Sequence, residues 1–461
     1  MRLHLAPSQI TALVLIPLLS VSLLLSPAVE ILTEVQLRAA LLIMGGMVLF
    51  ATGALPEFVS ALVVLVLAML IAVAPAAVVF SGLTSTACWL IFSGMVLGIA
   101  ITETGLAQRI SNRFVPRLSR SYLSLISGIV FMGVLLGLVM PSSVGRVMLF
   151  VPLALLIAQS CGFEKGNNGQ TGVLLAAAFG CHLPTFAILP ANIPNMIMIG
   201  SAETIHGWTP QFAEYLLLHF PVLGFLKALL LIGIIVRLYP DTPKRNNQPA
   251  GNGHFSRCEI RLMVIMLTTL AFWMTDSLHH ISAAWIGLAA ATLLLLPGIG
   301  MVSAKSFNEK VNISSILVVA GLLGIAGLIN HSGISQIAGE KVLNWLPLSP
   351  GSDLINFVSL SIGATAIGVM ATLAGVPATL TPLAEQISTM TGFSLEAVLM
   401  TQVFGFSTVV FTYQSIPIMM AMPLAGLPMK HAARLCLILA ALTLLILLPL
   451  DYLWWQLLGW I

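Results

Sequence analysis

The sequence predicts an all-α polytopic membrane protein, with about eleven transmembrane helices and two re-entrant helical hairpins in two inverted-topology repeats. The first observation is composition, because 58% of the 461 residues are hydrophobic and only 8% are charged. A soluble chain of this length needs more charge to cover its surface, so most of this surface must face lipid. The second is self-similarity. The Pro-Leu-Ala sequence at 152–154 recurs at 382–384, and the Phe-Gly pair at 179–180 recurs at 404–405.

The expected spans follow from hydropathy, because a helix needs roughly 17 to 25 apolar residues to cross the bilayer. In chain order they are 10–28, 36–53, 56–74, 86–105, 171–200, 215–238, 258–276, 280–297, 313–330, 394–425 and 431–457. Two further apolar stretches, 121–160 and 352–391, are too long for one span and are divided by small residues. We expect each of them to enter and leave the membrane on the same side.

The chain divides into two repeats around one polar linker. Residues 1–35 form an extra transmembrane helix, 36–238 the first repeat, 239–257 a cytoplasmic linker and 258–461 the second repeat. Each repeat holds one hairpin, at 121–160 or 352–391, followed by a broken helix, at 171–200 or 394–425. An odd number of crossings places the second copy upside down, as in secondary transporters.

The basic residues indicate the orientation. With the N-terminus inside, Arg38 and Lys341 fall outside, Arg146 and Lys227 lie within apolar stretches, and the other Lys and Arg residues fall on inner segments. This bias predicts a multi-pass protein of a bacterial inner membrane, with a cytoplasmic N-terminus and an outside C-terminus. A signal peptide at the start is the alternative, but the apolar run there is closer to a span in length.

The first hairpin turns at the sequence Pro-Ser-Ser-Val-Gly-Arg, residues 141–146. Pro141 cannot continue a helix, so the residues after it expose N–H groups at the start of the returning half-helix. Free N–H groups at a helix N-terminus bind anions, and water competes poorly at membrane depth. The alternative is a simple kink in one long helix, which the duplication and the charge distribution disfavour.

Each repeat also contains a second interruption. Three prolines between 184 and 194 prevent a regular helix there, and backbone freed in lipid must line a cavity or bind an ion. Asn192 and Asn195 stand beside this break, and the segment 411–417 is its counterpart in the second repeat.

Two ionisable residues lie near these breaks. Arg146 is expected to bind carboxylate or oxyanion groups, because a guanidinium within an apolar segment is costly and usually functional. Its alternatives are contact with the inner headgroups or pairing with an acid. His182 is the candidate for proton coupling, with hydrogen bonding to a local carbonyl as its alternative. Lys227 is expected to snorkel toward the headgroups or to pack between helices, and Glu385 is expected to satisfy a partner on its hairpin arm.

The hairpin sequence resembles the Ser-Asn-Thr motif of the divalent anion/sodium symporter (DASS) family, which reads Pro-Ser-Asn-Thr-Ala-Arg in the dicarboxylate and citrate branch. The two-repeat plan resembles that family over nearly the whole chain. The resemblance implies a homodimer that carries dicarboxylates, tricarboxylates or a sulfate-like oxyanion, with the triplets beside sodium. Here Ser143 and Val144 stand in place of Asn and Thr, and Thr-Leu-Ala at 372–374 replaces the second triplet. We therefore expect weak or absent sodium dependence.

The predicted binding site lies near the midplane, between the two hairpin tips and the two breaks. Its substrate-binding candidates are Ser142, Ser143, Gly145, Arg146, Thr185, Asn192, Asn195, Thr372, Gly375, Thr379, Thr412, Tyr413, Gln414 and Ser415. A coupling sodium ion would lie near Ser142, Asn192, Asn195, Thr372 and Ser415, and a coupling proton would use His182.

The expected function is secondary active transport of small anions, by symport or exchange. An enzyme is not expected, since HExxH, GxSxG and phosphate-loop patterns are absent and the five cysteines form no CxxC pair. We expect the lipid bilayer and a small anion as partners, and no nucleic acid. An anion channel remains an alternative, as does a cation/proton antiporter, although a cation site would be expected to hold acids at depth.

Overall fold

The computed structural model describes residues 7–26, 29, 32–106, 109, 121–140, 142–243, 255–334 and 346–461, so Pro141, Lys341 and residues 244–254 of the predicted linker lie outside it. Within these ranges every regular element is helical. Seven helices are long and apolar enough to cross a membrane, and five shorter apolar helices accompany them. Each predicted span and hairpin coincides with one or more helices, which confirms the predicted all-α polytopic fold class.

The first half of the chain begins with helices whose ends are set by local capping. Thr33 and Gln36 form a capping box at the start of α2, and Ser85 caps α6 through the N–H of Cys88. The elements are α1 (Pro7–Leu24), α2 (Glu34–Thr52), α3 (Glu57–Leu70), α4 (Ala76–Val79), α5 (Ser81–Thr84) and α6 (Thr86–Thr104).

The first hairpin and the first broken helix follow. Helix α8 (Tyr122–Val139) and helix α9 (Ser143–Ser160) are the two arms of the hairpin. The helix expected over 171–200 is interrupted, because α10 (Asn168–Gly180) ends before two 3₁₀ turns, and α11 (Ile193–His206) begins after them. The next span consists of α12 (Phe212–His219), a π-helical segment (Phe220–Leu226) and α13 (Lys227–Leu238).

The second half repeats this order of elements. It begins with α14 (Arg257–Met274), α15 (Asp276–His279), α16 (Ala283–Leu295), α17 (Ala304–Lys310) and α18 (Ile313–His331). Its hairpin comprises α20 (Asp353–Ala371), α21 (Gly375–Leu380), a 3₁₀ turn (Thr381–Leu383) and α22 (Ala384–Thr391). Its interrupted helix and last span are α23 (Leu395–Ser407), a 3₁₀ turn (Thr412–Gln414), α24 (Ile416–Ala425), α25 (Met429–Leu442), a π-helical segment (Thr443–Leu447) and α26 (Leu448–Leu458). This order supports the division into two repeats, which stays a prediction.

Glycines allow each hairpin to approach the first half of its broken helix. A Cβ at Gly180 would lie 2.9 Å from Cα of Val130 in α8. A Cβ at Gly405, the matching position of the second half, would lie 2.2 Å from Cβ of Ala364 in α20. Real Cβ atoms do not approach other atoms this closely, so both helix pairs depend on the missing side chain.

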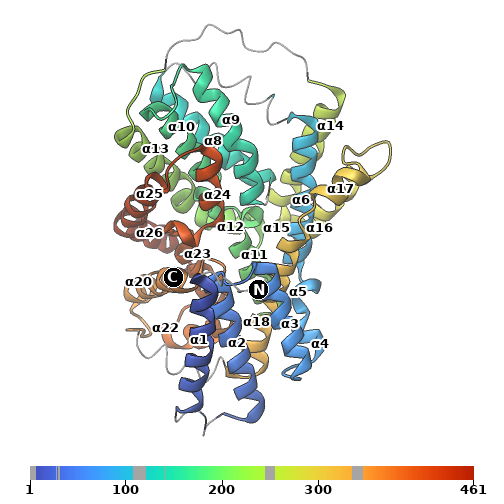
Figure 1. The fold of residues 1–461 in the computed structure, drawn as a ribbon, viewed down its shortest axis with the longest axis vertical. Coiled ribbons are helices and arrows are strands. Elements are labelled where there is room, and N and C mark those ends of the chain that lie inside the picture. The colour runs from blue at the N-terminus through green and yellow to red at the C-terminus, as the bar shows by residue number, and fades with distance from the viewer. Residues whose placement is uncertain are drawn as a thin grey trace, which may run out of the picture.

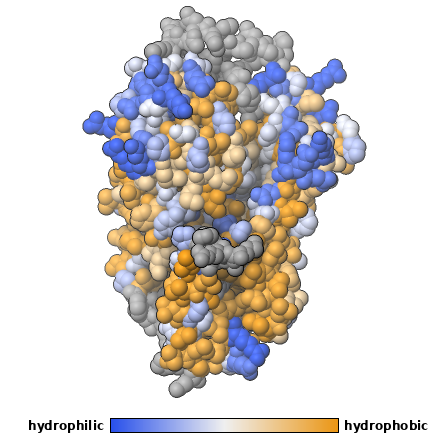
Figure 2. Space-filling model, in the orientation of Figure 1, coloured by the Kyte–Doolittle hydropathy of each residue, from blue (hydrophilic) through white to orange (hydrophobic). Residues whose placement is uncertain are grey.

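The arrangement of the helices leaves the interrupted helices in the middle of the molecule. Figure 1 shows α8, α9, α10 and α13 gathered at one end, α1 to α4 at the other, and α6 beside α14 and α16. On the face drawn in Figure 2, hydrophilic side chains gather at the end near α14 and α17, and hydrophobic ones cover most of the rest. Several large apolar side chains of the molecule are highly exposed, such as Leu278 at 80% and Leu457 at 76%, as expected for contact with lipid.

Candidate functional site

A cavity of about 1110 Å³ lies where the two hairpin tips and the two breaks meet. Its opposite wall comes from α2, α3, α6 and α18. Of the predicted site residues, those that line it are Ser142, Ser143, Gly145, His182, Asn192, Thr372, Gly375, Thr379, Tyr413, Gln414 and Ser415. The structure does not place Arg146, Thr185, Asn195 or Thr412 in the lining.

The first hairpin tip presents the start of α9 to the cavity. Ser142 is the N-cap, and its Oγ accepts a hydrogen bond from the N–H of Gly145 at 3.1 Å. The first-turn N–H groups of Ser143 and Val144 have no carbonyl partner within their own helix, and both residues line the cavity. The Ser143 hydroxyl donates to Oδ1 of Asn192, which joins the tip to the first break.

Arg146 lies behind this tip and is fully buried. Its Nε donates to the carbonyl of Cys181 at 2.8 Å, at the end of α10, and its Nη1 donates to the carbonyl of Ala191 at 2.9 Å. Its Nη2 donates to Oγ1 of Thr185 at 2.8 Å. The complete set of acceptors is the carbonyls of Met140, Cys181 and Ala191 and the side-chain oxygens of Ser143, Thr185 and Asn192. A guanidinium has five N–H donors, so none is left for a carboxylate in this conformation.

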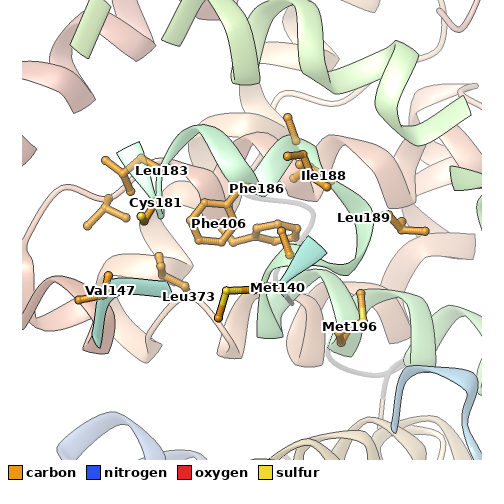
Figure 3. Close-up of a cluster of buried hydrophobic side chains, with 14 of the residues drawn as sticks. Met140, Val147, Cys181, Leu183, Phe186, Ile188, Leu189, Met196, Leu373 and Phe406 are labelled. Atoms are coloured by element: carbon orange, nitrogen blue, oxygen red, sulfur yellow. The ribbon is translucent and has the colours of Figure 1, made fainter. Parts of the chain in front are cut away.

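The side chain of Asn195 also bonds to the protein backbone within the first break. Nδ2 of Asn195 donates to the carbonyls of Phe186, Ile188 and Leu189 at 3.0, 2.9 and 3.2 Å. These carbonyls have lost their helical partners, and lipid offers no replacement. Figure 3 shows the apolar packing around this break, where the rings of Phe186 and Phe406 meet with centroids 5.9 Å apart.

The second break is joined to the first through one hydrogen bond. Ser415 caps α24, and its Oγ lies 2.8 Å from Nε2 of His182. Oε1 of Gln414 accepts from the N–H of Phe411 at 2.7 Å, and the Tyr413 hydroxyl donates to the carbonyl of Val369 at 2.6 Å in the arm of the second hairpin. The predicted proton-coupling residue His182 therefore bridges the two breaks.

The tip of the second hairpin has an unusual backbone. Thr372 adopts a φ of 90° at the C-terminal end of α20. A β-branched residue rarely adopts a positive φ, and such strain tends to occur at binding sites. The sequence Thr-Leu-Ala-Gly gave no signal of this conformation.

Two charged side chains, which sequence reasoning missed, line the cavity. Glu57 begins α3 and Lys310 ends α17, and both line the cavity. Lys310 also forms an ion pair with Glu103. Within the described residues, Glu57 is the only acid in the lining, so none lies at the hairpin tips.

Comparison with known proteins decides the family. The sequence matches the sodium:sulfate symporter transmembrane region over residues 7–461. The chain belongs to the sodium:sulfate symporter family. This assignment confirms the resemblance found in the sequence, and the structure is that of a multi-pass membrane protein.

The relatives of this sodium:sulfate symporter family member include named transporters. Dicarboxylate transporter 2.2, chloroplastic, of Arabidopsis thaliana is 27% identical over 66% of this chain and 58% of that protein. The L-tartrate/succinate antiporter of Escherichia coli K12 is 26% identical over 55% of both chains, and a membrane protein of Cupriavidus necator is 25% identical over 71% of this chain and 66% of that protein. The matches thus span less than two thirds of each relative.

Two solved structures share the fold. The Alcanivorax borkumensis YdaH transporter has a TM-score of 0.57 at 15% identity, over 83% of this chain and 88% of that one. Neisseria gonorrhoeae MtrF, described with a class of antimetabolite efflux pumps, has a TM-score of 0.51 at 14% identity, over 79% and 80%. At such low identity these likenesses concern the fold of this sodium:sulfate symporter family member and not its substrate.

Proposed function

We propose that this protein is a secondary active transporter of small dicarboxylate anions that works by alternating access. The observation that carries the proposal is the convergence of three helix N-termini on one cavity. Helices α9, α11 and α24 begin at Ser143, Ile193 and Ile416, and all three residues line it. A helix N-terminus attracts negative charge, and the absence of acids at the described tips leaves this attraction unopposed.

The names of two relatives support a dicarboxylate as the substrate. One is called a dicarboxylate transporter and the other an L-tartrate/succinate antiporter. A dicarboxylate carries two separated negative groups, and the cavity offers helix starts from both halves of the chain. Tricarboxylates and sulfate-like oxyanions remain within the same chemical class.

The orientation and the moving parts belong to the same proposal. With a cytoplasmic N-terminus, Glu57 and Lys310 lie on inner segments, and the cavity opens toward the cytoplasm. The hairpins, the interrupted helices and the spans that follow them would then move against α1 to α6 and α14 to α18. The family resemblance implies a homodimer. In such a dimer, α1 to α6 and α14 to α18 would form the part that stays fixed.

The first break does not fit a sodium ion. The carbonyls of Met140, Cys181 and Ala191 already accept from Arg146, and Oδ1 of Asn192 accepts from Ser143. A fixed guanidinium would also repel a second cation at this place. We therefore retain the expectation of weak or absent sodium dependence, with coupling either to protons or to exchange of one anion for another.

The test is counterflow in proteoliposomes. Vesicles that contain the purified full chain and unlabelled succinate are expected to take up labelled succinate with saturation. The rate is expected to agree within about twofold between sodium and choline buffers, since a required coupling ion would change it by tenfold or more. The membrane potential is held at zero, and tartrate, citrate and sulfate are added as competitors.

Two results, linear uptake and proton/cation exchange, would contradict this function, and sodium stimulation would contradict only the expectation about the coupling ion. Linear uptake without acceleration by internal succinate would indicate the alternative anion channel. Strong saturable stimulation by sodium alone would show that the altered triplets still bind that ion. Exchange of protons for a metal cation, with no competition by any of the four anions, would indicate the cation/proton antiporter.

A further inference from the structure

A second group of ionisable side chains is buried outside the cavity, between α12, α13, α23 and α26. Lys227 and His219 are each 1% exposed, and Asp451 is fully buried. Ionisable side chains within membrane-spanning helices are costly, and they commonly mark ion pathways and proton relays. The cavity and its hydrogen bonds, as described above, give none of these three residues a role.

Lys227 connects this group to the second break. Its Nζ donates to both the carbonyl and the Oγ of Ser407 at 3.1 Å. Ser407 is the last residue of α23, so the ammonium group sits at the negative end of that half-helix. The chain continues from Ser407 through the break to Tyr413 and Ser415 in the cavity lining.

Asp451 has unused hydrogen-bonding capacity. Across the part of the chain that the structure describes, neither of its carboxylate oxygens has a hydrogen-bond partner. The charges of Lys227 and Asp451 act on each other, yet the ammonium group donates to Ser407 and not to the carboxylate. Nδ1 of His219 also lacks a partner within the same ranges. The indole N–H of Trp455, one turn along α26, lies near enough to interact with the carboxylate, but it does not reach hydrogen-bond geometry. A buried carboxylate without hydrogen bonds is costly, so its position here calls for a role.

The elements around Asp451 contribute few other titratable groups. Helix α12 carries Glu214, Tyr215 and His219, and His219 meets the ring of Trp455 with centroids 5.9 Å apart. Helix α20 also packs against α26, and it places Phe357 on Trp455 at 5.2 Å, while its one titratable residue, Asp353, stands in its first turn. The two π-helical segments carry none.

A π-helical segment precedes each of the two charged residues, Lys227 and Asp451. One ends at Leu226, immediately before Lys227, and the other ends at Leu447, one turn before Asp451. Such segments widen a helix and frequently occur at functional sites. Lys227 and Asp451 therefore each follow a locally widened stretch of helix, and the two stretches occupy matching places in the two halves of the chain.

We propose that Asp451, with Lys227 beside it, is a proton-binding site that couples proton movement to anion transport. The proposal rests on the proposed function. A proton from water binds to one carboxylate oxygen of Asp451 while Lys227 remains an ammonium ion, so the pair changes from neutral to a net charge of plus one. The proton leaves to water on the opposite side after the moving part has changed its orientation.

The coupling follows from charge. The added positive charge lies behind α23, whose continuation lines the cavity, and it favours the bound anion. Linkage is reciprocal, so the bound anion favours the proton equally. Nδ1 of His182 also lacks a partner among the described residues. His182 nevertheless fits this role less well, because the charge of Arg146 acts on its ring. A proton on His182 would place a second positive charge beside that guanidinium.

The test separates net uptake from exchange in proteoliposomes that contain the full chain. With the membrane potential clamped at zero, an inward gradient of about one pH unit is expected to drive about tenfold accumulation of succinate, if one proton accompanies each anion. Asp451→Asn is expected to lose this accumulation and to keep succinate counterflow at equal pH within about twofold of the wild type. Glu309→Gln, at an exposed acid of α17, is the matched control and is expected to keep both activities.

A measurement on the unmodified protein covers the case in which Asp451→Asn does not fold. Succinate added to the wild type in weakly buffered detergent is expected to cause proton uptake, which a pH indicator reports. The proposal is overturned if Asp451→Asn still accumulates succinate like the wild type. It is also overturned if the wild type shows neither proton uptake nor a response to the pH gradient. Counterflow in that last case would leave the proposed function standing, whereas its loss in the wild type would remove both.

Discussion

Arg146→Met is expected to destabilise the protein severely. The substitution leaves the buried carbonyl of Met140 without its donor, and the carbonyls of Cys181 and Ala191 keep only the longer contacts from the hydroxyls of Thr185 and Ser143, at 3.3 and 3.4 Å. An unpaired buried carbonyl costs about 1–3 kcal/mol, so weakening all three at once removes a large part of the stability of a typical domain. Arg146→Lys keeps the charge and three donors, and an intermediate loss is expected because the planar fork is gone. Thermal unfolding of the purified variants in detergent measures the effect.

The control is Arg38→Met, at a half-exposed arginine that pairs with Glu34 on the surface of α2. This change should leave the unfolding temperature within experimental error, since exposed ion pairs contribute little. The role assigned to Arg146 would be wrong if Arg146→Met unfolded like the wild type and bound succinate ten- to a hundredfold more weakly. That pattern would instead identify Arg146 as a direct ligand of the anion.

Gly405→Val is expected to have the second largest effect. Its Cβ would lie 2.2 Å from Cβ of Ala364 and 2.8 Å from the carbonyl carbon of the same residue. Backbone atoms cannot yield as a flexible side chain does, so α23 and α20 would have to separate. Overpacking of this kind costs about 1–3 kcal/mol or more. A lower unfolding temperature and reduced yield of folded protein are the expected readouts.

The matched control is Gly233→Val in α13, where an added Cβ meets nothing within 4 Å. This variant should unfold close to the wild-type temperature. Gly180→Val is expected to resemble Gly405→Val, because Gly180 contacts α8 in the corresponding way. If Gly405→Val were as stable as Gly233→Val, the close contact between α20 and α23 would have to be absent in the protein.

The hairpins and breaks could be predicted because their signals are local. Prolines at 184, 190 and 194 interrupt a helix wherever they occur, and the self-similarity of the chain indicates their counterparts. The partners of Arg146 could not be predicted in this way. Three of its acceptors, at Cys181, Ala191 and Asn192, are 35, 45 and 46 residues away along the chain. Its isolated position in an apolar stretch therefore suggested a substrate ligand.

Other features have no signal in the pattern of residues. The sequence predicts helical spans at 215–238 and 431–457 and does not predict the π-helical segments inside them. The opposite wall of the cavity was missed because α6 and α18 are apolar helices without a motif. Lys227 was expected to pack between helices, and its contact with Ser407 required the two halves of the chain to be placed together.

The network around Arg146 has a consequence for the direction of transport. Hydrogen bonds join the hairpin tip to the first break, so this half of the binding surface would move as one rigid body between the inward-facing and outward-facing states. Because its shape would be the same in both states, its affinity for the anion would be similar on the two sides of the membrane. A carrier with equal affinity on both sides has little intrinsic preference for import or export, so the gradients of the anion and of the coupled proton would together decide the direction of net transport.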